Sequence, residues 1–228
     1  MPGRTGAQYR LALGLAAALL TAALPLAHAQ FADDRSEFVG LLKLWAFTAY
    51  VSLIGGNVTL SDNNVTLRGG IPLIEYLEHG HYVGIDVRAE ALEEGRVELR
   101  EHGLEDKAPT LIAFDDFAGL ALEREFDVVW AFAVLFHLSD EILDACLAFV
   151  ASHLKPDGVF YANVRLGQDR EGAWQGFPVV TRSQEHYVEA AARAGLTVER
   201  VGTLGDLGHR SGARAADNQV MLRFSPVA

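Results

Sequence analysis

Residues 126–164 read FDVVWAFAVLFHLSDEILDACLAFVASHLKPDGVFYANV, and this stretch decides the fold. It begins and ends with apolar runs, 126–132 and 159–164, of the kind that form strands buried on both faces. Between them, Ser139 is followed by two acids and by apolar residues at helical spacing, which predicts a capped helix. The segment 155–158, KPDG, predicts a turn before the second run. A strand, a helix and a second buried strand in this order predict a parallel sheet covered by helices.

The same alternation continues on both sides of this stretch. We predict strands at 82–87, 110–114, 126–132, 159–164, 197–203 and 219–224, a first strand within 49–62, and helices at 71–77, 89–102, 139–154 and 183–195. The last two strands have no helix between them, so they should pair antiparallel at one edge. The predicted fold class is α/β, a doubly wound, mostly parallel, seven-stranded sheet with one antiparallel edge strand.

Composition excludes several classes of protein. The chain has 228 residues, of which 50% are hydrophobic and 21% charged, as in an ordinary globular domain. Cys146 is the only cysteine, so an internal disulfide and a cysteine zinc site are excluded. The net charge is −11 and no basic run occurs, so we expect no nucleic-acid partner. His79 and His81 lack a nearby third ligand, which favours a surface turn over a metal site.

The first residues have the pattern of a secretory signal. Arg4 and Arg10 precede an uncharged run, 11–27, and Ala27-His28-Ala29 supplies small residues at a cleavage site. The run is at the lower limit for crossing a bilayer, so an uncleaved anchor is the alternative. We expect export to the periplasm or the extracellular space, with no stable membrane contact unless 11–27 stays uncleaved. The predicted parts are 1–29, an atypical segment 30–66 and a domain 67–228.

Polar residues at strand ends are the candidate ligand-binding groups, because open parallel sheets bind ligands at the carboxyl ends of their strands. Asp86 ends one predicted strand, Asp115 and Asp116 follow the next, and residues 131–137 follow the third. The first acid can accept both hydroxyls of a ribose, and an acid one strand later can accept from an adenine amino group. The alternative for each is a helix cap or a turn residue.

Three segments resemble the class I S-adenosylmethionine-dependent methyltransferases: LRGGIPLIEYLEHGHYVGIDV at 67–87, FDD at 114–116 and the stretch 126–164. The resemblance implies a Rossmann-like fold and S-adenosylmethionine as cofactor. It also implies cofactor-binding roles for Arg68, Gly69, Gly70, Asp86, Asp115, Asp116 and Ala131, with Asp86 at the ribose, Asp115 or Asp116 at the adenine and Ala131 at the methionine part. The KPDG turn resembles a structural turn of the family.

One motif departs from the family pattern. Where family members with an LRGG segment have GCGSLRGG, this chain has NNVTLRGG at 63–70, so the two loop glycines are missing. Glycines there let the backbone approach the cofactor closely. The leading hypothesis is methyl transfer to an unidentified acceptor, and the alternative is an inactive methyltransferase-like binding module. A nicotinamide dehydrogenase is disfavoured because its glycine fingerprint is also missing and because the final strand pair does not fit it.

Three further expectations concern the acceptor and the compartment. His137 is the best-placed base if the acceptor must lose a proton; the alternative is a histidine that caps the strand. Trp174 and Phe177 lie in a Gly-rich segment, 167–178, that either shapes an acceptor pocket or is a loop anchored by aromatic side chains. A frameshift or fusion within residues 1–66 is the alternative to a genuine exported protein, and the domain would then be cytoplasmic.

Overall fold

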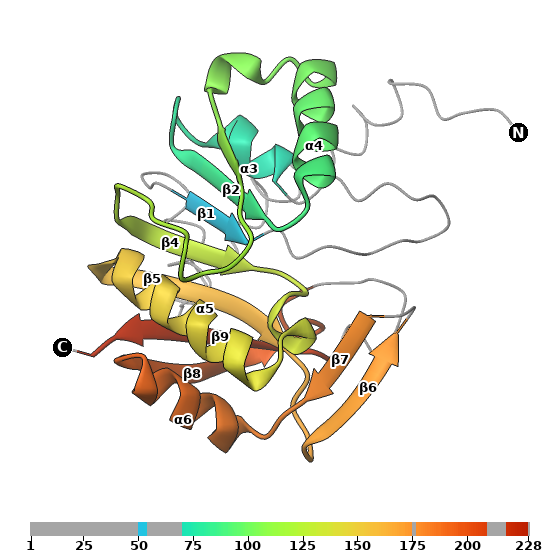
Figure 1. The fold of residues 1–228 in the computed structure, drawn as a ribbon, viewed down its shortest axis with the longest axis vertical. Helices are drawn as coiled ribbons and strands as arrows, with labels where there is room; N and C mark the ends of the chain where they lie inside the picture. The colour runs from blue at the N-terminus through green and yellow to red at the C-terminus, as the bar shows by residue number, and fades with distance from the viewer. Residues whose placement is uncertain (1–49, 54–69, 175–176, 209–217, 228) are drawn as a thin grey trace, which may run out of the picture. The chain divides into compact units, whose positions relative to one another are not determined.

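The computed structural model describes residues 50–53, 70–174, 177–208 and 218–227 (Figure 1). The chain divides into two compact units, Met1–Lys43 and Leu44–Ala228, and every described residue belongs to the second. The predicted signal segment 1–29 therefore lies outside the described residues. Within the described part of the chain, none of the helices combines the length and the apolar character needed to cross a membrane.

The second unit is built on a seven-stranded sheet with the order β3-β2-β1-β4-β5-β9-β8. Its strands are β1 (Tyr50–Leu53), β2 (Tyr82–Asp86), β3 (Thr110–Ala113), β4 (Phe126–Ala131), β5 (Leu154–Val164), β8 (Leu196–Thr203) and β9 (Val220–Pro226). The strands from β3 to β5 pair in parallel. The predicted α/β class is confirmed. β1 lies inside the predicted range 49–62 and occupies the centre of the sheet, so a strand of the segment 30–66 belongs to it.

The position predicted for the antiparallel strand is wrong. β9 runs antiparallel to both β5 and β8, so it lies between them, and the edge strand is β8. The physical reason is the crossover after β5, which contains a helix. It places β8 two positions from β5 in the sheet and so leaves one strand position open between them. β9 then returns in the opposite direction and fills the space between β5 and β8. An antiparallel pair needs no crossover, which is why no helix separates these last two strands.

The central strands are apolar because helices cover them. All five residues of β2 are buried, and β5 is buried from Gly158 to Val164. The helices are α3 (Ile71–Tyr76), α4 (Ala89–Glu101), α5 (Asp140–His153) and α6 (Gln184–Arg193). Figure 1 shows α5 and α6 lying over β5, β9 and β8. Their buried faces join the sheet in one hydrophobic cluster, which includes Cys146 as predicted.

Serine side chains cap the two helices that follow β4 and β7, the first at Ser139 as predicted. Ser139 Oγ accepts from the Ile142 backbone N–H at the start of α5, and Ser183 Oγ accepts from the His186 N–H at the start of α6. Each bond satisfies a donor that has no partner within the helix. These caps fix where the helices begin, and therefore where the preceding loops meet the sheet.

The predicted turn at 155–158 bulges out of the ladder between β4 and β5. Leu154 pairs with Phe126 and Val159 pairs with Val128, so the intervening residues of β5 have no partner in register. Gly158 is required there, because a Cβ on it would lie 2.7 Å from the Phe126 carbonyl oxygen.

The segment 167–178 contains strands rather than only the predicted loop. β6 (Arg170–Trp174) and β7 (Phe177–Thr181) pair antiparallel as a separate two-stranded sheet. The β-branched run at the end of β7, Val179-Val180-Thr181, suits a strand and was the available sequence signal. Figure 1 shows this hairpin on the side of the large sheet toward which β4 points. The side chains of Trp174 and Phe177 lie outside the described part of the structure, so their acceptor-pocket role stays a prediction.

Candidate functional site

Asp86 ends β2 at the carboxyl edge of the sheet, as predicted, and it is only 2% exposed. Its Oδ1 accepts from the Arg88 backbone N–H at 2.8 Å and lies 3.7 Å from Arg88 Nε. Its Oδ2 is buried and has no hydrogen-bond partner among the described residues. Burial raises the pKa of Asp86, and the contacts with Arg88 oppose that rise only in part.

An unpartnered buried carboxylate oxygen is unfavourable on its own. Leaving such an acceptor without a donor costs about 1–3 kcal/mol. A ligand that brings hydroxyl groups to this strand end would supply the missing donors. The Oδ2 atom of Asp86 therefore fits the ribose of a nucleoside better than it fits a helix-capping role, and no α4 amide beyond Arg88 donates to the carboxylate.

Asp115 and Asp116 lie one strand away from Asp86. Asp86 pairs in register with Ala113, and the Phe114 N–H donates to the Asp86 carbonyl oxygen at 3.2 Å. Both acids are exposed, and Asp116 Oδ1 accepts from the Gly119 N–H at 2.6 Å within its own turn. Asp116 is thus a turn residue, and Asp115 is the acid whose carboxylate has no partner in the described part of the chain.

The end of β4 is held by buried polar side chains that the sequence did not indicate. Ala131 is fully buried, and Ala133 two residues later has a left-handed backbone with φ of 59°. The Ala133 N–H donates to Asn163 Oδ1 at 2.7 Å, and Asn163 Nδ2 donates to Gln219 Oε1. Asn163 is fully buried in β5. The available signal was a lone amide within an otherwise apolar strand.

His137 ends the short helix η3 (Leu135–His137), just beyond β4. Its Nδ1 lies 2.6 Å from the Pro178 carbonyl oxygen of β7. A carbonyl only accepts, so Nδ1 carries a proton, and in the neutral form of the ring Nε2 is the unprotonated nitrogen. Nε2 has no hydrogen-bond partner among the described residues. The ring is therefore oriented by β7 and has a free proton-accepting nitrogen.

A buried arginine holds the η3 segment in place. Arg182 is 1% exposed, and its Nη2 and Nη1 donate to the Leu138 carbonyl at 2.6 Å and the Leu135 carbonyl at 3.4 Å. Its Nε donates to Asp140 Oδ1 at 2.9 Å. The hydrogen bond from Arg182 lowers the pKa of Asp140. Sequence reasoning missed Arg182, because its partners are more than forty residues away along the chain.

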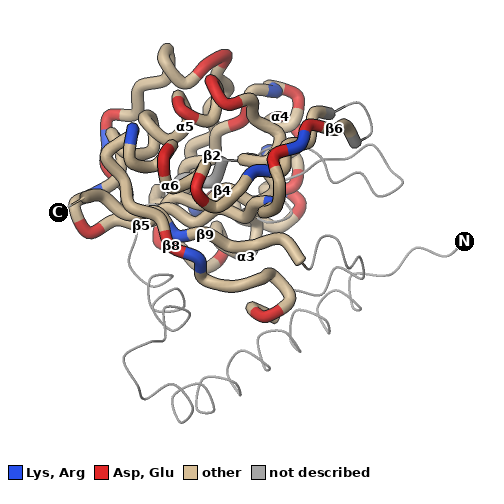
Figure 2. The backbone as a smooth tube through the Cα atoms, turned by 90° about the horizontal axis from the view of Figure 1, so that it is seen from below, with Lys and Arg blue, Asp and Glu red and all other residues tan. Residues whose placement is uncertain are grey.

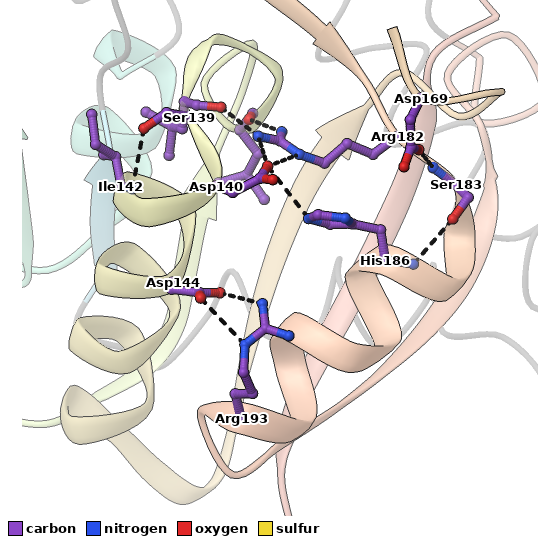
Figure 3. A network of polar contacts seen from close by, with 11 residues as sticks. Ser139, Asp140, Ile142, Asp144, Asp169, Arg182, Ser183, His186 and Arg193 are labelled. Carbon is purple, nitrogen blue, oxygen red and sulfur yellow. Dashed lines mark hydrogen bonds and ion pairs between the residues drawn. The ribbon is translucent and has the colours of Figure 1, made fainter.

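Figure 3 shows how this network links α5 and α6. Asp140 Oδ1 also lies 3.5 Å from His186 Nε2 in the first turn of α6. Further along both helices, Arg193 Nη2 donates to Asp144 Oδ1 at 2.7 Å, in an exposed ion pair. The two pairs join the same helices, but only Arg182 reaches the carbonyls of the segment that carries His137.

No contact among the described residues brings the remaining predicted cofactor residues, 68–70, to this edge of the sheet. Arg68 and Gly69 lie outside the described residues, as do the positions 63–66 where the family glycines are missing. Gly70 is buried and is the residue that precedes α3, with φ of −83°, which any residue can adopt. The predicted contribution of this loop to cofactor binding therefore stays a prediction.

Two further features do not belong to the site. A cavity of about 220 Å³ is lined in part by Arg96, Arg100 and Ala108. It lies where β3 begins, which in a parallel sheet is the edge opposite Asp86. His79 lies in an exposed turn, where its Nδ1 contacts the Asp106 carbonyl oxygen. Over the described residues, no cluster of three potential metal ligands occurs.

Figure 2 shows the Lys and Arg positions of the described chain as short segments along the backbone, with Asp and Glu segments among them. The absence of a nucleic-acid partner stays an expectation from net charge.

Comparisons with known proteins agree with this geometry. Residues 66–160 match the methyltransferase domain family. None of the curated proteins matches the sequence. Three solved structures share the fold at 13–18% identity. An S-adenosylmethionine-dependent methyltransferase from Clostridium acetobutylicum ATCC 824 is 13% identical, with a TM-score of 0.59, and the match covers 92% of this chain and 100% of that one.

The glycopeptide N-methyltransferase MtfA, solved with S-adenosyl-L-homocysteine, is 14% identical with a TM-score of 0.60, and the match covers 86% of this chain and 91% of that one. The O-methyltransferase NcsB1 from neocarzinostatin biosynthesis is 18% identical with a TM-score of 0.55, and the match covers 83% and 53%. At these identities the likeness to solved structures shows the fold.

Proposed function

We infer from the methyltransferase-domain match over residues 66–160 and from the shared fold that this chain is a class I S-adenosylmethionine-dependent methyltransferase, and we propose that it transfers a methyl group from S-adenosylmethionine to an acceptor held at the carboxyl edge of the sheet. The observation that carries the proposal is the buried Asp86 carboxylate with an unpartnered Oδ2. In a nucleoside-containing cofactor, the ribose hydroxyls are the donors that this oxygen lacks.

The remaining strand ends have complementary roles in this proposal. Asp115 accepts from the adenine amino group, since Asp116 is already engaged by the Gly119 N–H. Ala131 and the backbone of Ala133 line the methionine part of the cofactor, held in position by Asn163. When bound, S-adenosylmethionine supplies an activated methyl group on a sulfonium. The protein then has to align the acceptor and exclude water.

His137 is the proposed base. The Pro178 carbonyl keeps the proton on Nδ1, so Nε2 is free to accept a proton from a hydroxyl or amine of the acceptor. The solved neighbours include both an N- and an O-methyltransferase, so the fold does not decide between these two acceptor atoms. The choice of acceptor therefore depends on the side chains that line the site in this chain.

Calorimetric titration with S-adenosylhomocysteine tests the proposal. We expect the wild-type protein to bind it and Asp86→Asn to weaken binding on the order of 30- to 1000-fold, because charge-assisted hydrogen bonds to two hydroxyls are lost. Asp157→Asn is the matched control, since it removes the same charge from an exposed residue at the bulge in β5. Binding should be unchanged in that variant.

Two outcomes would contradict the proposal. If wild-type protein gave no heat with S-adenosylmethionine or S-adenosylhomocysteine at millimolar concentration, the inactive binding module would replace the enzyme. If Asp86→Asn bound as tightly as wild type, the ribose site would have to lie elsewhere.

A further inference from the structure

Arg165 follows the last residue of β5, at the same carboxyl edge as Asp86 and His137. Its guanidinium carbon lies 5.0 Å from the centroid of the Phe136 ring. Its Nε is buried without a hydrogen-bond partner, and no acid pairs with its side chain among the described residues. The Arg165 carbonyl accepts from the Arg182 N–H at 3.2 Å, so its backbone is fixed beside Arg182, the residue that holds η3 in place.

Two other arginines close to this edge each contact an acid. Arg88 contacts Asp86, and Arg182 contacts Asp140 and two carbonyls. Asp169, four residues after Arg165, uses Oδ1 to accept from the Ser183 N–H. Among the described residues, Arg165 is therefore a cation without a counter-charge.

The contact with the Phe136 ring holds the guanidinium in place and leaves its N–H groups available to a ligand. A guanidinium that lies over an aromatic ring uses its flat face, while all of its N–H groups point outward in its own plane. Two adjacent N–H groups of that edge match the two oxygens of a carboxylate or phosphate. The buried Nε–H has no partner among the described residues, so an oxyanion would satisfy a donor that is otherwise lost.

The position of Arg165 relates it to the proposed base. The His137 ring centroid lies 4.5 Å from the same Phe136 centroid, so it is within 10 Å of the Arg165 guanidinium carbon. A small acceptor can span that distance. We propose that Arg165 binds a carboxylate or phosphate of the methyl acceptor, so that the acceptor is a small anionic molecule whose nucleophilic oxygen or nitrogen points toward His137. This inference rests on the proposed methyl-transfer function.

The test uses three probes that share one phenyl ring: benzoate, its neutral isostere benzamide, and phenyl phosphate. Each is titrated by calorimetry into the full-length protein, with and without saturating S-adenosylhomocysteine. We expect at least one anion to bind wild type about tenfold or more tightly than benzamide. A preference for benzoate or for phenyl phosphate identifies which oxyanion the acceptor carries.

Variants of Arg165 test whether this residue causes the preference for an anion over benzamide. Arg165→Gln should abolish the preference for the anion, and Arg165→Lys should restore it in part, because the charge returns without the planar fork. Arg200→Gln removes the same charge from an exposed residue of β8 and should leave the preference intact. Circular dichroism of each variant verifies that it is folded.

The outcomes separate this inference from the proposed function. If S-adenosylhomocysteine binds but neither anion is preferred over benzamide, or if Arg165→Gln keeps the preference, the anion site is refuted and methyl transfer stands. If an anion binds through Arg165 but no S-adenosylhomocysteine binds, the anion site stands and methyl transfer is refuted.

Discussion

The buried carboxylate of Asp86, the proposed ribose-binding residue, lowers the stability of the fold at neutral pH. Burial raises its pKa, so the native state holds this proton more tightly than the unfolded chain does. Stability contributed by the protonated form is then lost as pH rises from the ordinary value of 3.8 through the native pKa. At neutral pH the buried, ionised carboxylate lowers the free energy of unfolding, and a ligand that donates hydrogen bonds to it would offset that loss.

We therefore expect Asp86→Asn to raise the free energy of unfolding at pH 7, where the wild-type residue is charged, and to change it less at pH 4. The amide keeps an oxygen for the Arg88 N–H and carries no buried charge. Urea unfolding at both pH values measures the effect. A variant that is less stable than wild type at pH 7 would show that Asp86 is structural.

The sequence could place some candidate residues and not others. It placed Asp86, Asp115 and His137 beyond strand ends because the strand-end rule needs only local pattern, and their roles in binding stay predictions. Asn163, Arg182 and Arg165 were missed, because each matters through a partner that folding brings from elsewhere. Asn163 meets Gln219, which is 56 positions away, and no spacing along the chain indicates such a pair.

At the scale of elements, periodicity identified the parallel strands and the caps identified the helices. The hairpin β6–β7 was missed because glycines and charged residues in 167–178 have the composition of a loop. The first strand could only be bracketed, since Tyr50–Leu53 belongs to a longer apolar run without a stop signal. Gly55 and Gly56 follow that strand closely in sequence, whereas the segment that resembles the family motif lies at 63–70.

The Arg182 clamp on η3 and α5 gives an element-scale prediction. Arg182→Met removes the donors to Leu135, Leu138 and Asp140, so we expect a loss of about 2–4 kcal/mol in the free energy of unfolding. In the same variant, the pH profile of methyl transfer should shift or flatten, because His137 loses its fixed orientation. Thermal and urea unfolding together with activity against pH measure these effects.

Arg193→Met is the matched control for the clamp. It breaks the exposed pair with Asp144 between the same two helices and touches no carbonyl of η3. Exposed pairs contribute little, so stability should barely change and the pH profile should not move. Equal effects of the two variants would mean that the clamp only joins α5 to α6.

At the scale of the whole molecule, the remaining proposal concerns where the protein is used. The N-terminal pattern predicts cleavage after Ala29, so mature protein from the native host should begin at Gln30. N-terminal sequencing of the protein recovered from periplasm or medium checks this. An intact Met1, or a start near residue 67 in a cytosolic extract, would contradict export and favour a frameshift or fusion.

The place of β9 between β5 and β8 governs the order in which the sheet can be completed during synthesis. β5, α6 and β8 all leave the ribosome before β9, yet until β9 arrives β5 is paired only with β4 and β8 has no partner strand. Until then, two strand edges face an unfilled gap, and exposed edges of this kind recruit other chains. The nascent protein is therefore most prone to aggregation in the interval between synthesis of residue 203 and residue 226, and a chaperone that covers strand edges would act there.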